Sequence, residues 1–300
     1  MANTQEDLLI CVACGTQFDV LADKPLKACR ICDDPRQFVP PTGQAWTSLG
    51  QMRGQYSNKF KQVGDSDWEG RMWSIVTEPK FAIGQRCVLI ENDDGNVLWD
   101  CITYLDEETI DFIKQKGGLE AIVISHPHYY TTHLDWAKTF DCPVYIAHDD
   151  QEWLSRDDEE QRRRLIDGSS EHIVGDAIAI KVGGHFPGSL VLLWNKKLLI
   201  ADSFVTTPSA LYHTDRLRGT TSYAFMWAVP NMIPLPPAEL HKMWKAIKPY
   251  EFDSTHGAFV GQEVQEVQDG KVKRRVLESM KIQTKAMGWE EHALLAEEYP

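Results

Sequence analysis

Residues 121–131 read AIVISHPHYYT, a short apolar segment that ends in two histidines separated by one proline. The run AIVIS predicts a buried strand, and His126 and His128 follow it directly. In an extended segment, residues i and i+2 point to the same side, so both imidazoles can reach one metal ion. The stretch therefore predicts a strand whose end carries metal ligands.

Three more polar residues stand where predicted strands meet loops. His185 lies in the segment 183–189, GGHFPGS, between two predicted strands. Asp202 follows the apolar run LLIA, and His256 lies in the segment STHG at 254–257. In layered α/β proteins the ends of strands are where sites are assembled. We therefore expect these residues to join the two histidines of 121–131.

With these motifs in order, the chain from residue 73 to residue 288 resembles the metallo-β-lactamase superfamily. His126 and His128 match the first two histidines of the family's HxHxDH motif, and His185 matches the histidine of its GHTPGS-type motif. Asp202 matches the aspartate that reaches the metal from a strand end, and His256 matches the last histidine. The resemblance implies an α/β fold, the four-layer αββα sandwich, with the site at one edge.

The sequence departs from the family motif at two positions. Tyr130 stands where the motif has its aspartate, and Thr131 stands where it has its third histidine. Both positions normally serve a second metal ion. A phenol is a poor zinc ligand at neutral pH because its pKa is about 10, and a threonine hydroxyl is poorer.

The remaining ligands favour one catalytic metal ion over two. The first metal keeps the three motif histidines, with an open fourth position. Ligands for a second metal are reduced to Asp202 and His256, with His133 as a further candidate. Asp202 is then either a fourth ligand or the group that holds the metal-bound water.

A second metal motif lies near the N-terminus. Cys11 and Cys14 form one CxxC pair, and Cys29 and Cys32 form another. Two such knuckles supply the four sulfurs of a tetrahedral zinc site, and Gly15 follows the first where a positive φ is often needed. The segment resembles a rubredoxin-like zinc ribbon. A closed four-sulfur site is structural. The alternatives are a redox dithiol or four unrelated cysteines, and iron is not excluded as the metal.

The cofactor prediction is therefore Zn²⁺, with one structural ion in the ribbon and one, or at most two, at the histidines. The expected organisation is a zinc-ribbon module at 1–40, a connecting arm at 41–70 and a metallo-β-lactamase-like domain at 71–300. Within that domain, Asp106 is expected to cap a helix, and 134–140, 240–247 and the segment from 271 onward are expected to be helical. The charged run 155–168 is expected to be a solvated helix or loop face.

Composition limits the partners and the compartment. The chain has 300 residues, with 31 Lys and Arg against 44 Asp and Glu, which gives a net charge of −13. That balance argues against nucleic acid and against anionic membranes. No apolar run approaches the ~20 residues of a membrane span, and the N-terminus MANTQEDLLI lacks the basic start of a signal peptide. We expect a cytoplasmic protein in which Cys87, Cys101 and Cys142 are buried thiols.

The expected activity is hydrolysis of a small carbonyl substrate: a lactam, lactone, ester or thioester. Zinc bound to three neutral imidazoles lowers the pKa of its water to about 7, and the metal-bound hydroxide attacks the carbonyl. Asp202 would orient the water, His256 would assist as an acid or residual ligand, and Tyr130 would donate to the developing oxyanion. The alternatives are an iron-dependent oxidoreductase, a nuclease, which the acidic charge disfavours, and a non-catalytic protein that binds partners through its ribbon.

The segment 208–237 is an aromatic-rich insertion that contains His213. It is expected either to pack on the sandwich or to form a wall of the substrate pocket.

Overall fold

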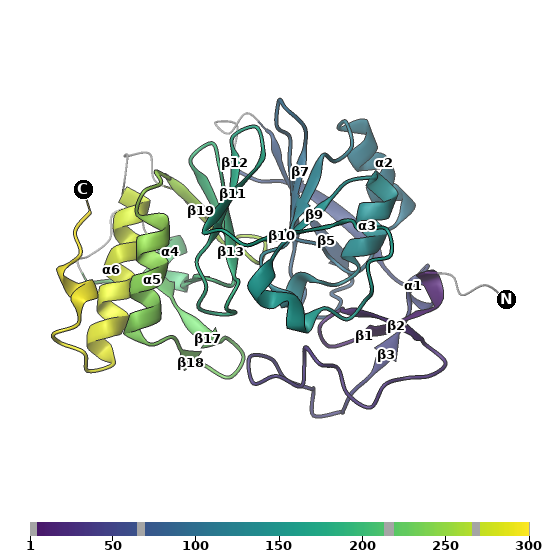
Figure 1. Cartoon of the computed structure of the whole chain (residues 1–300), viewed down its shortest axis with the longest axis horizontal. Coiled ribbons are helices and arrows are strands. Elements are labelled where there is room, and N and C mark those ends of the chain that lie inside the picture. The colour runs from purple at the N-terminus through teal and green to yellow at the C-terminus, as the bar shows by residue number, and fades with distance from the viewer. Residues whose placement is uncertain (1–4, 65–69, 213–218, 266–270, 300) are drawn as a thin grey trace. The chain divides into compact units, whose positions relative to one another are not determined.

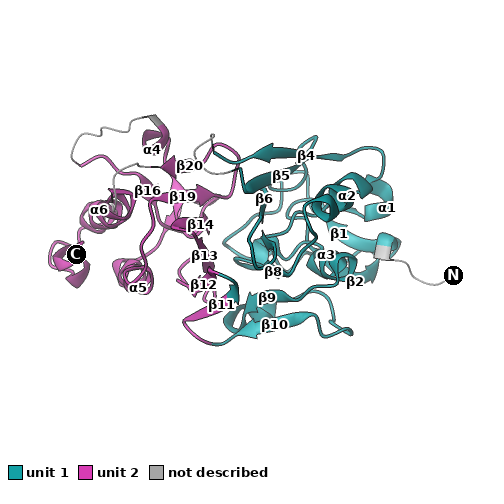
Figure 2. Ribbon diagram, turned by 90° about the horizontal axis from the view of Figure 1, so that it is seen from above, with its two compact units in different colours: residues 1–167, 173–175 teal, residues 168–172, 176–300 magenta. Residues whose placement is uncertain are grey.

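The computed structural model describes residues 5–64, 70–212, 219–265 and 271–299 (Figure 1). The chain divides into two compact units (Figure 2). Unit 1 comprises Met1–Asp167 with Ile173–Gly175, and unit 2 comprises Gly168–His172 with Asp176–Pro300. Among the described residues, no helix combines the length and the apolar character that crossing a membrane requires.

Unit 1 is built on a seven-stranded mixed sheet with the order β10-β9-β8-β7-β6-β5-β4. The strands β4 to β7 pair antiparallel, and β7 to β10 pair parallel. Every residue of β6, β7 and β8 is buried, as expected for strands made of continuous apolar runs. The strands are β4 (Ser57–Gln62), β5 (Met72–Glu78), β6 (Cys87–Ile90), β7 (Val97–Trp99), β8 (Ala121–Val123), β9 (Val144–Ala147) and β10 (Arg163–Ile166).

Two helices pack on this sheet, α2 (Glu107–Gln115) and α3 (His133–Phe140). Asp106 caps α2 as predicted, because its carboxylate accepts a hydrogen bond from the amide of Thr109. Phe112 of α2 stacks on Phe60 of β4 with the ring centroids 4.2 Å apart. Unit 1 also contains the short helices η3 (Pro127–Tyr129) and η4 (His148–Trp153).

The N-terminal part of unit 1 forms a three-stranded sheet with the order β2-β1-β3. Its elements are η1 (Gln5–Asp7), β1 (Leu8–Cys11), β2 (Gln17–Leu21), β3 (Trp46–Thr47) and α1 (Leu49–Met52). Ile10, Met52, Phe81 and Tyr104 form a small apolar core, which joins this sheet to later parts of unit 1.

The segment 41–70, expected to be a connecting arm, contains regular structure. β3 extends the ribbon sheet, and β4 forms the edge of the large sheet, paired with β5 over six residues. Asn58 of β4 is buried and donates to the carbonyl of Tyr104 and the hydroxyl of Thr109, both at 2.8 Å. Because a polar residue occupies this buried position, the apolar pattern of the sequence did not indicate a strand here.

The charged run 155–168 also differs from expectation, because it contains β10, which pairs in parallel with β9. In this strand Arg163 is partly buried, Arg164 and Leu165 are exposed, and Ile166 is buried. Charged side chains are common on edge strands, where they prevent further pairing. The edge position accounts for a strand whose composition suggested a solvated loop.

Unit 2 contains a six-stranded sheet with the order β11-β12-β13-β14-β19-β20. Asn195 and Lys196 connect β13 and β14 with φ values of 43° and 60°, in a tight hairpin. β14 and β19 pair in parallel. The strands are β11 (Ser170–Val174), β12 (Ala177–Lys181), β13 (Leu190–Trp194), β14 (Lys197–Ala201), β19 (Ser254–Gly257) and β20 (Glu263–Gln265).

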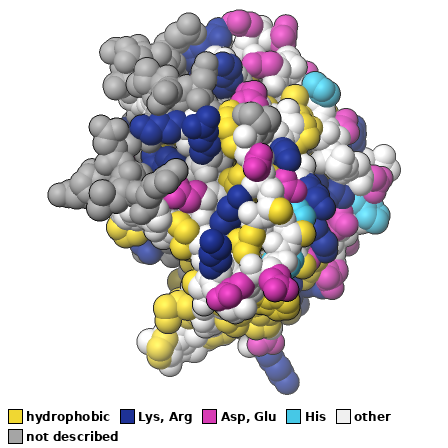
Figure 3. Space-filling view, turned by 90° about the vertical axis from the view of Figure 1, so that its left-hand side faces the viewer, with side chains coloured by type: hydrophobic (Ala, Val, Ile, Leu, Met, Phe, Trp, Pro, Cys, Tyr) yellow, Lys and Arg dark blue, Asp and Glu magenta, His cyan; other side chains and the backbone are white. Residues whose placement is uncertain are grey.

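The helices α5 (Pro237–Ile247) and α6 (Lys271–Ala286) close the core of unit 2. Leu240, Met243, Trp244 and Ile247 pack with Ile200 of the sheet, as the helical spacing predicted. The side of the molecule that carries these helices has Lys and Arg side chains interspersed with Asp and Glu (Figure 3). The shorter elements of unit 2 are β15 (Val205–Thr206), α4 (Pro208–Tyr212), β16 (Tyr223–Ala224), β17 (Met226–Ala228), β18 (Ile233–Pro234) and η5 (Ala293–Ala296).

Candidate metal centres

The four N-terminal cysteines converge in unit 1. Their sulfur atoms all lie within 4.8 Å of one another, and all four residues are buried. The Sγ atoms of Cys11 and Cys32 are 3.6 Å apart, and those of Cys14 and Cys29 are also 3.6 Å apart. Hydrogen bonds from the other thiols, that of Cys14 first, lower the pKa of Cys11. Four soft sulfur donors around one point fit a tetrahedral zinc or iron ion.

The turns around these cysteines explain how the chain brings them together. Gly15 has a φ of 84°, as expected after a knuckle, and its amide donates to the carbonyl of Cys11 at 2.8 Å. The amide of Asp33 likewise donates to the carbonyl of Cys29 at 2.8 Å. The side chain of Gln44 donates to the sulfur of Cys11 at 3.1 Å, a contact that the cysteine spacing alone did not predict.

The imidazoles of His126 and His128 lie beside each other in unit 1. Both are buried, their ring centroids are 5.1 Å apart, and their ligand nitrogens lie within 4.8 Å of each other. The sequence suggested an extended backbone between them. The structure differs, because η3 begins at Pro127. A tight helical turn after the strand thus brings the two rings together.

A hydrogen-bonded chain orients His126. The carboxylate of Asp100 accepts from the amide of Ser125 at 2.7 Å, and the hydroxyl of Ser125 contacts Nδ1 of His126 at 2.9 Å. Asp100 is buried and has a φ of 64°. The sequence did not predict the contribution of Ser125. With Nδ1 occupied, Nε2 is the nitrogen that His126 would offer to a metal.

Tyr130 and Thr131, the two departures from the family motif, are buried and bonded within the protein. The hydroxyl of Tyr130 donates to the carbonyl of Asp150 at 2.9 Å, and burial raises the pKa of Tyr130 well above its usual value. The hydroxyl of Thr131 contacts the carbonyl of Cys101 at 3.3 Å. The phenol of Tyr130 thus already donates its proton, and its catalytic role stays a prediction.

His133, the further candidate ligand, has both ring nitrogens occupied. Nδ1 contacts the carbonyl of Tyr130, and Nε2 contacts Nε of Arg163 at 2.9 Å. Because Arg163 can only donate, Nε2 accepts and Nδ1 carries the proton. Burial, followed by the charge of Arg163, lowers the pKa of His133 to about 3. His133 therefore serves the structure of unit 1 in its neutral form.

In unit 2, His185 and Asp202 come together with their ligand atoms within 4.8 Å of each other. Nδ1 of His185 contacts the carbonyl of Trp227 at 2.9 Å, which fixes the ring and directs Nε2 to the ligand position. Asp202 directly follows β14, where Ala201 has a φ of 43°. Trp227 lies on β17, so the insertion contributes a backbone contact that the sequence did not reveal.

His256 lies within β19, next to β14 in the same sheet, rather than after a strand. It is buried, and its Nε2 lies 3.3 Å from the hydroxyl of Ser254. It is not part of the group that contains His185 and Asp202. A role for His256 as a ligand or an acid stays a prediction.

Some side chains of the insertion 208–237 are buried in the core of unit 2, and others are exposed. Tyr223 and Phe225 are buried in the core of unit 2. Met232 is 78% exposed and Ile233 is 41% exposed on the hairpin of β17 and β18. His213 lies outside the described residues.

Comparisons with known proteins agree with this architecture. No protein-family model matches the chain. The uncharacterized protein YmaE of Bacillus subtilis (strain 168) is 38% identical over 274 residues, which are 91% of this chain and 95% of that protein. The chain belongs to the YmaE family. The resemblance extends along nearly the whole length of both proteins.

Solved metallo-β-lactamases share the fold. FIM-1 from Pseudomonas aeruginosa, solved in its mono-zinc form, has a TM-score of 0.52 at 13% identity, over 78% of this chain and 96% of that chain. TMB-1 has a TM-score of 0.50 at 14% identity, over 77% and 99%. DIM-1 has a TM-score of 0.50 at 11% identity, over 77% and 98%. These likenesses confirm the predicted metallo-β-lactamase fold.

Proposed function

We propose that the protein is a metal-dependent hydrolase of small carbonyl substrates, and that His126, His128, His185 and Asp202 hold its catalytic metal ion. The observation that carries the proposal is the donor chemistry inside each unit. Unit 1 places two buried imidazoles side by side, and unit 2 places an imidazole beside a carboxylate. Three imidazoles and one carboxylate suit zinc, and they do not exclude iron.

The hydrogen bonds to Nδ1 support this assignment. The Ser125 hydroxyl contacts Nδ1 of His126, and the Trp227 carbonyl accepts from Nδ1 of His185. Such partners fix the ring orientation and the tautomer of a metal-binding histidine and raise its basicity. A bound zinc ion of this kind activates water and polarises a carbonyl.

The other residues are proposed to bind and orient. Asp202 would orient the attacking water or accept its proton, and His256 would assist as an acid or as a residual ligand. The exposed Met232 and Ile233 and the half-buried Trp227 belong to the β17–β18 hairpin, and Trp227 holds His185. An apolar hairpin at this position would favour a small, largely apolar carbonyl compound, such as an aryl lactam or lactone.

The test is a substrate panel. Lactams, lactones, thioesters and phosphodiesters are compared with the same zinc-loaded protein, and with the same protein after chelation and after zinc is restored. We expect turnover of one of the carbonyl classes, lost on chelation and recovered with zinc. Turnover of phosphodiesters alone, or oxygen uptake by iron-loaded protein, would replace this proposal with a different reaction.

His128→Ala should remove the catalytic metal without unfolding the protein. Turnover should fall by about a thousandfold or more, because the metal supplies several kcal/mol of transition-state stabilisation. His148→Ala is the matched control, since the side chain of His148 is 55% exposed at the start of η4. Elemental analysis and kcat/KM are measured for both variants. Full activity in His128→Ala would contradict the assignment of His128 as a ligand of the catalytic metal.

A further inference from the structure

We propose that the four-cysteine ribbon is a positioning element for the segment 126–131, here called the histidine loop. The ribbon would hold this loop in its metal-binding shape through the backbone of Gly15 and Gln17. The inference rests on the proposed function in one respect only, namely that His126 and His128 bind metal. All the contacts that carry it lie within unit 1.

The most direct contact joins the ribbon backbone to the loop backbone. The amide of Gln17 donates to the carbonyl of Thr131 at 3.1 Å. Gln17 is three residues after Cys14, and Thr131 is three residues after His128. Thr131 has a φ of 29°, which an L-residue rarely adopts unless its surroundings impose it. The amide of Gln17 supplies one of the bonds that impose it.

A second contact passes through Thr103. Its hydroxyl donates to the carbonyl of Gly15 at 3.1 Å, and its own carbonyl accepts from the hydroxyl of Thr132 at 2.8 Å. The approach is so close that a Cβ on Gly15 would lie 2.0 Å from the Thr103 hydroxyl oxygen. The glycine of the cysteine knuckle therefore packs against the residue that bonds Thr132, which directly follows the histidine loop.

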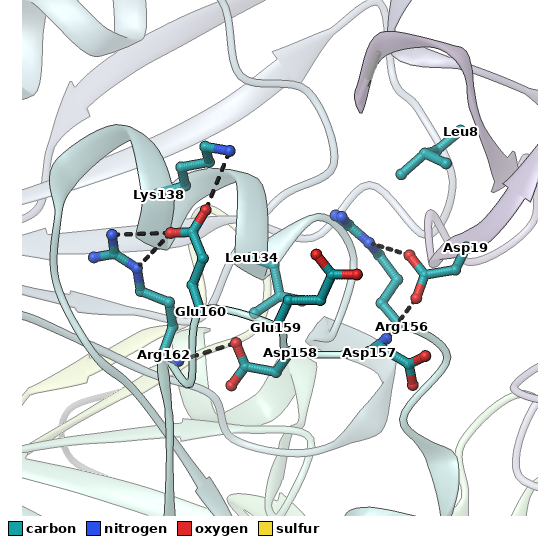
Figure 4. Close-up of a pocket in the computed structure, with 10 residues that line it drawn as sticks. All are labelled: Leu8, Asp19, Leu134, Lys138, Arg156, Asp157, Asp158, Glu159, Glu160 and Arg162. Atoms are coloured by element: carbon teal, nitrogen blue, oxygen red, sulfur yellow. Dashed lines mark hydrogen bonds and ion pairs between the residues drawn. The ribbon is translucent and has the colours of Figure 1, made fainter. Parts of the chain in front are cut away.

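A third contact is a network of side chains around the buried Gln17. Gln17 is 1% exposed; its amide group donates to Asp135 of α3 at 3.1 Å and accepts from Arg156. Arg156 also bonds Asp135 at 2.8 Å. Its guanidinium donates to Asp19 of β2 at 3.0 Å (Figure 4). α3 begins two residues after Thr131, so the network fixes the helix that follows the loop.

The cysteine site controls the segment that makes these contacts. The sulfur of Cys14 lies 3.3 Å from the hydroxyl of Thr16, and the amide of Cys11 donates to the carbonyl of Thr16 at 3.0 Å. Gly15 and Gln17 flank Thr16. A metal held by four sulfurs fixes such a short knuckle, so the occupied ribbon would present the Gln17 amide to Thr131 in a constant position.

The first test removes the hydrogen bond between Thr103 and Gly15 and leaves every cysteine and histidine in place. Thr103→Val removes the hydroxyl that donates to Gly15 at nearly constant volume, and Thr103→Ser restores it. Arg53→Ala is the control, because Arg53 pairs with Glu6 on an exposed part of unit 1. The full chain is loaded with Co²⁺, whose thiolate-bound form absorbs strongly in the near ultraviolet and whose imidazole-bound form gives only weak visible bands. Both sites can thus be followed in one titration with a competing chelator.

We expect Thr103→Val to lose Co²⁺ from the histidines at about tenfold lower chelator concentration, the lower end of what supporting hydrogen bonds contribute to metal affinity. The thiolate band should persist, and Thr103→Ser and Arg53→Ala should match the wild type. Equal retention at the histidines in Thr103→Val and in the wild type would overturn the inference.

A second measurement needs no metal at the histidines. Hydrogen exchange of the peptide that spans 126–133 should accelerate in Thr103→Val, and in wild-type protein whose ribbon metal has been removed. Unchanged exchange in both samples would also overturn the inference. If the wild type binds Co²⁺ at the histidines but hydrolyses nothing, the proposed function fails and the positioning role is still decided by these two readouts.

Discussion

At the scale of single residues, His133 shows how burial selects a protonation state. It is 4% exposed and lies next to the cationic side chain of Arg163, to which it is hydrogen bonded. Burial and this neighbouring charge both oppose protonation, so the pKa of His133 falls to about 3. A nitrogen that accepts from arginine is not available to a metal ion.

This depressed pKa predicts a pH dependence of stability. The unfolded chain protonates His133 below about pH 6.5, whereas the folded chain does not until about pH 3. Its contribution is therefore complete above pH 6.5 and is lost as the pH falls towards 3. Between pH 6.5 and pH 5 the free energy of unfolding should fall by about 2 kcal/mol because of this group.

His133→Gln should remove that part of the slope, as measured by denaturant unfolding at several pH values. His148→Gln, at an exposed histidine, should keep the wild-type slope. Identical slopes in all three proteins would mean that His133 titrates normally.

At the scale of the element, the turn of the β13–β14 hairpin holds a residue other than glycine at a positive φ, which costs conformational free energy. Lys196 has a φ of 60° at its turn. Lys196→Gly should raise the free energy of unfolding by about 0.5–1 kcal/mol, because glycine adopts this conformation without steric cost. Lys197→Gly, one residue into β14, should lower it instead. Thermal melts of the two variants provide the measurement, and a lower melting temperature in both would contradict the prediction.

The ribbon is the second element for which a prediction can be made. Cys14→Ser should release one metal ion per chain and destabilise the protein by several kcal/mol, because metal binding and folding are coupled in so small a module. Cys142→Ser is the comparison, since Cys142 is buried but lies outside the four-cysteine group. Elemental analysis and thermal melts are made on both. Full metal content in Cys14→Ser would rule out a four-sulfur site.

At the scale of the whole molecule, the expected metal content is two ions per chain, one at the cysteines and one at the histidines. Tyr130, Thr131 and His133 are the residues of unit 1 that could have served a second catalytic metal. Each of these side chains already bonds another protein group. Tyr130 bonds the carbonyl of Asp150, and Thr131 bonds the carbonyl of Cys101. His133 bonds the carbonyl of Tyr130 and the side chain of Arg163.

Elemental analysis of the purified protein tests this stoichiometry. His185→Ala should bind one ion, the one at the cysteines. Three ions in the wild type would show that Asp202, His256 and a further group rebuild the second catalytic position.

Sequence by itself determined the parts of this protein that depend on short-range pattern. The two CxxC pairs, the HPH and GGHFPGS motifs, the Asp106 cap and the helical spacing of 240–247 can all be read within a few residues. Each reflects a local requirement, such as a ligand spacing or an orphan amide that a carboxylate satisfies. The metallo-β-lactamase fold followed from the order of these motifs.

Tertiary structure decided what depends on partners distant along the chain. β4 and β10 carry polar or charged residues and are strands because β5 and β9 lie beside them. The same holds for the neutral state of His133, set by burial and then by the charge of Arg163, and for the contact of Gln17 with Thr131. Hydrogen bonds and burial of this kind arise only when folding brings separated segments together, so no local pattern could have revealed them.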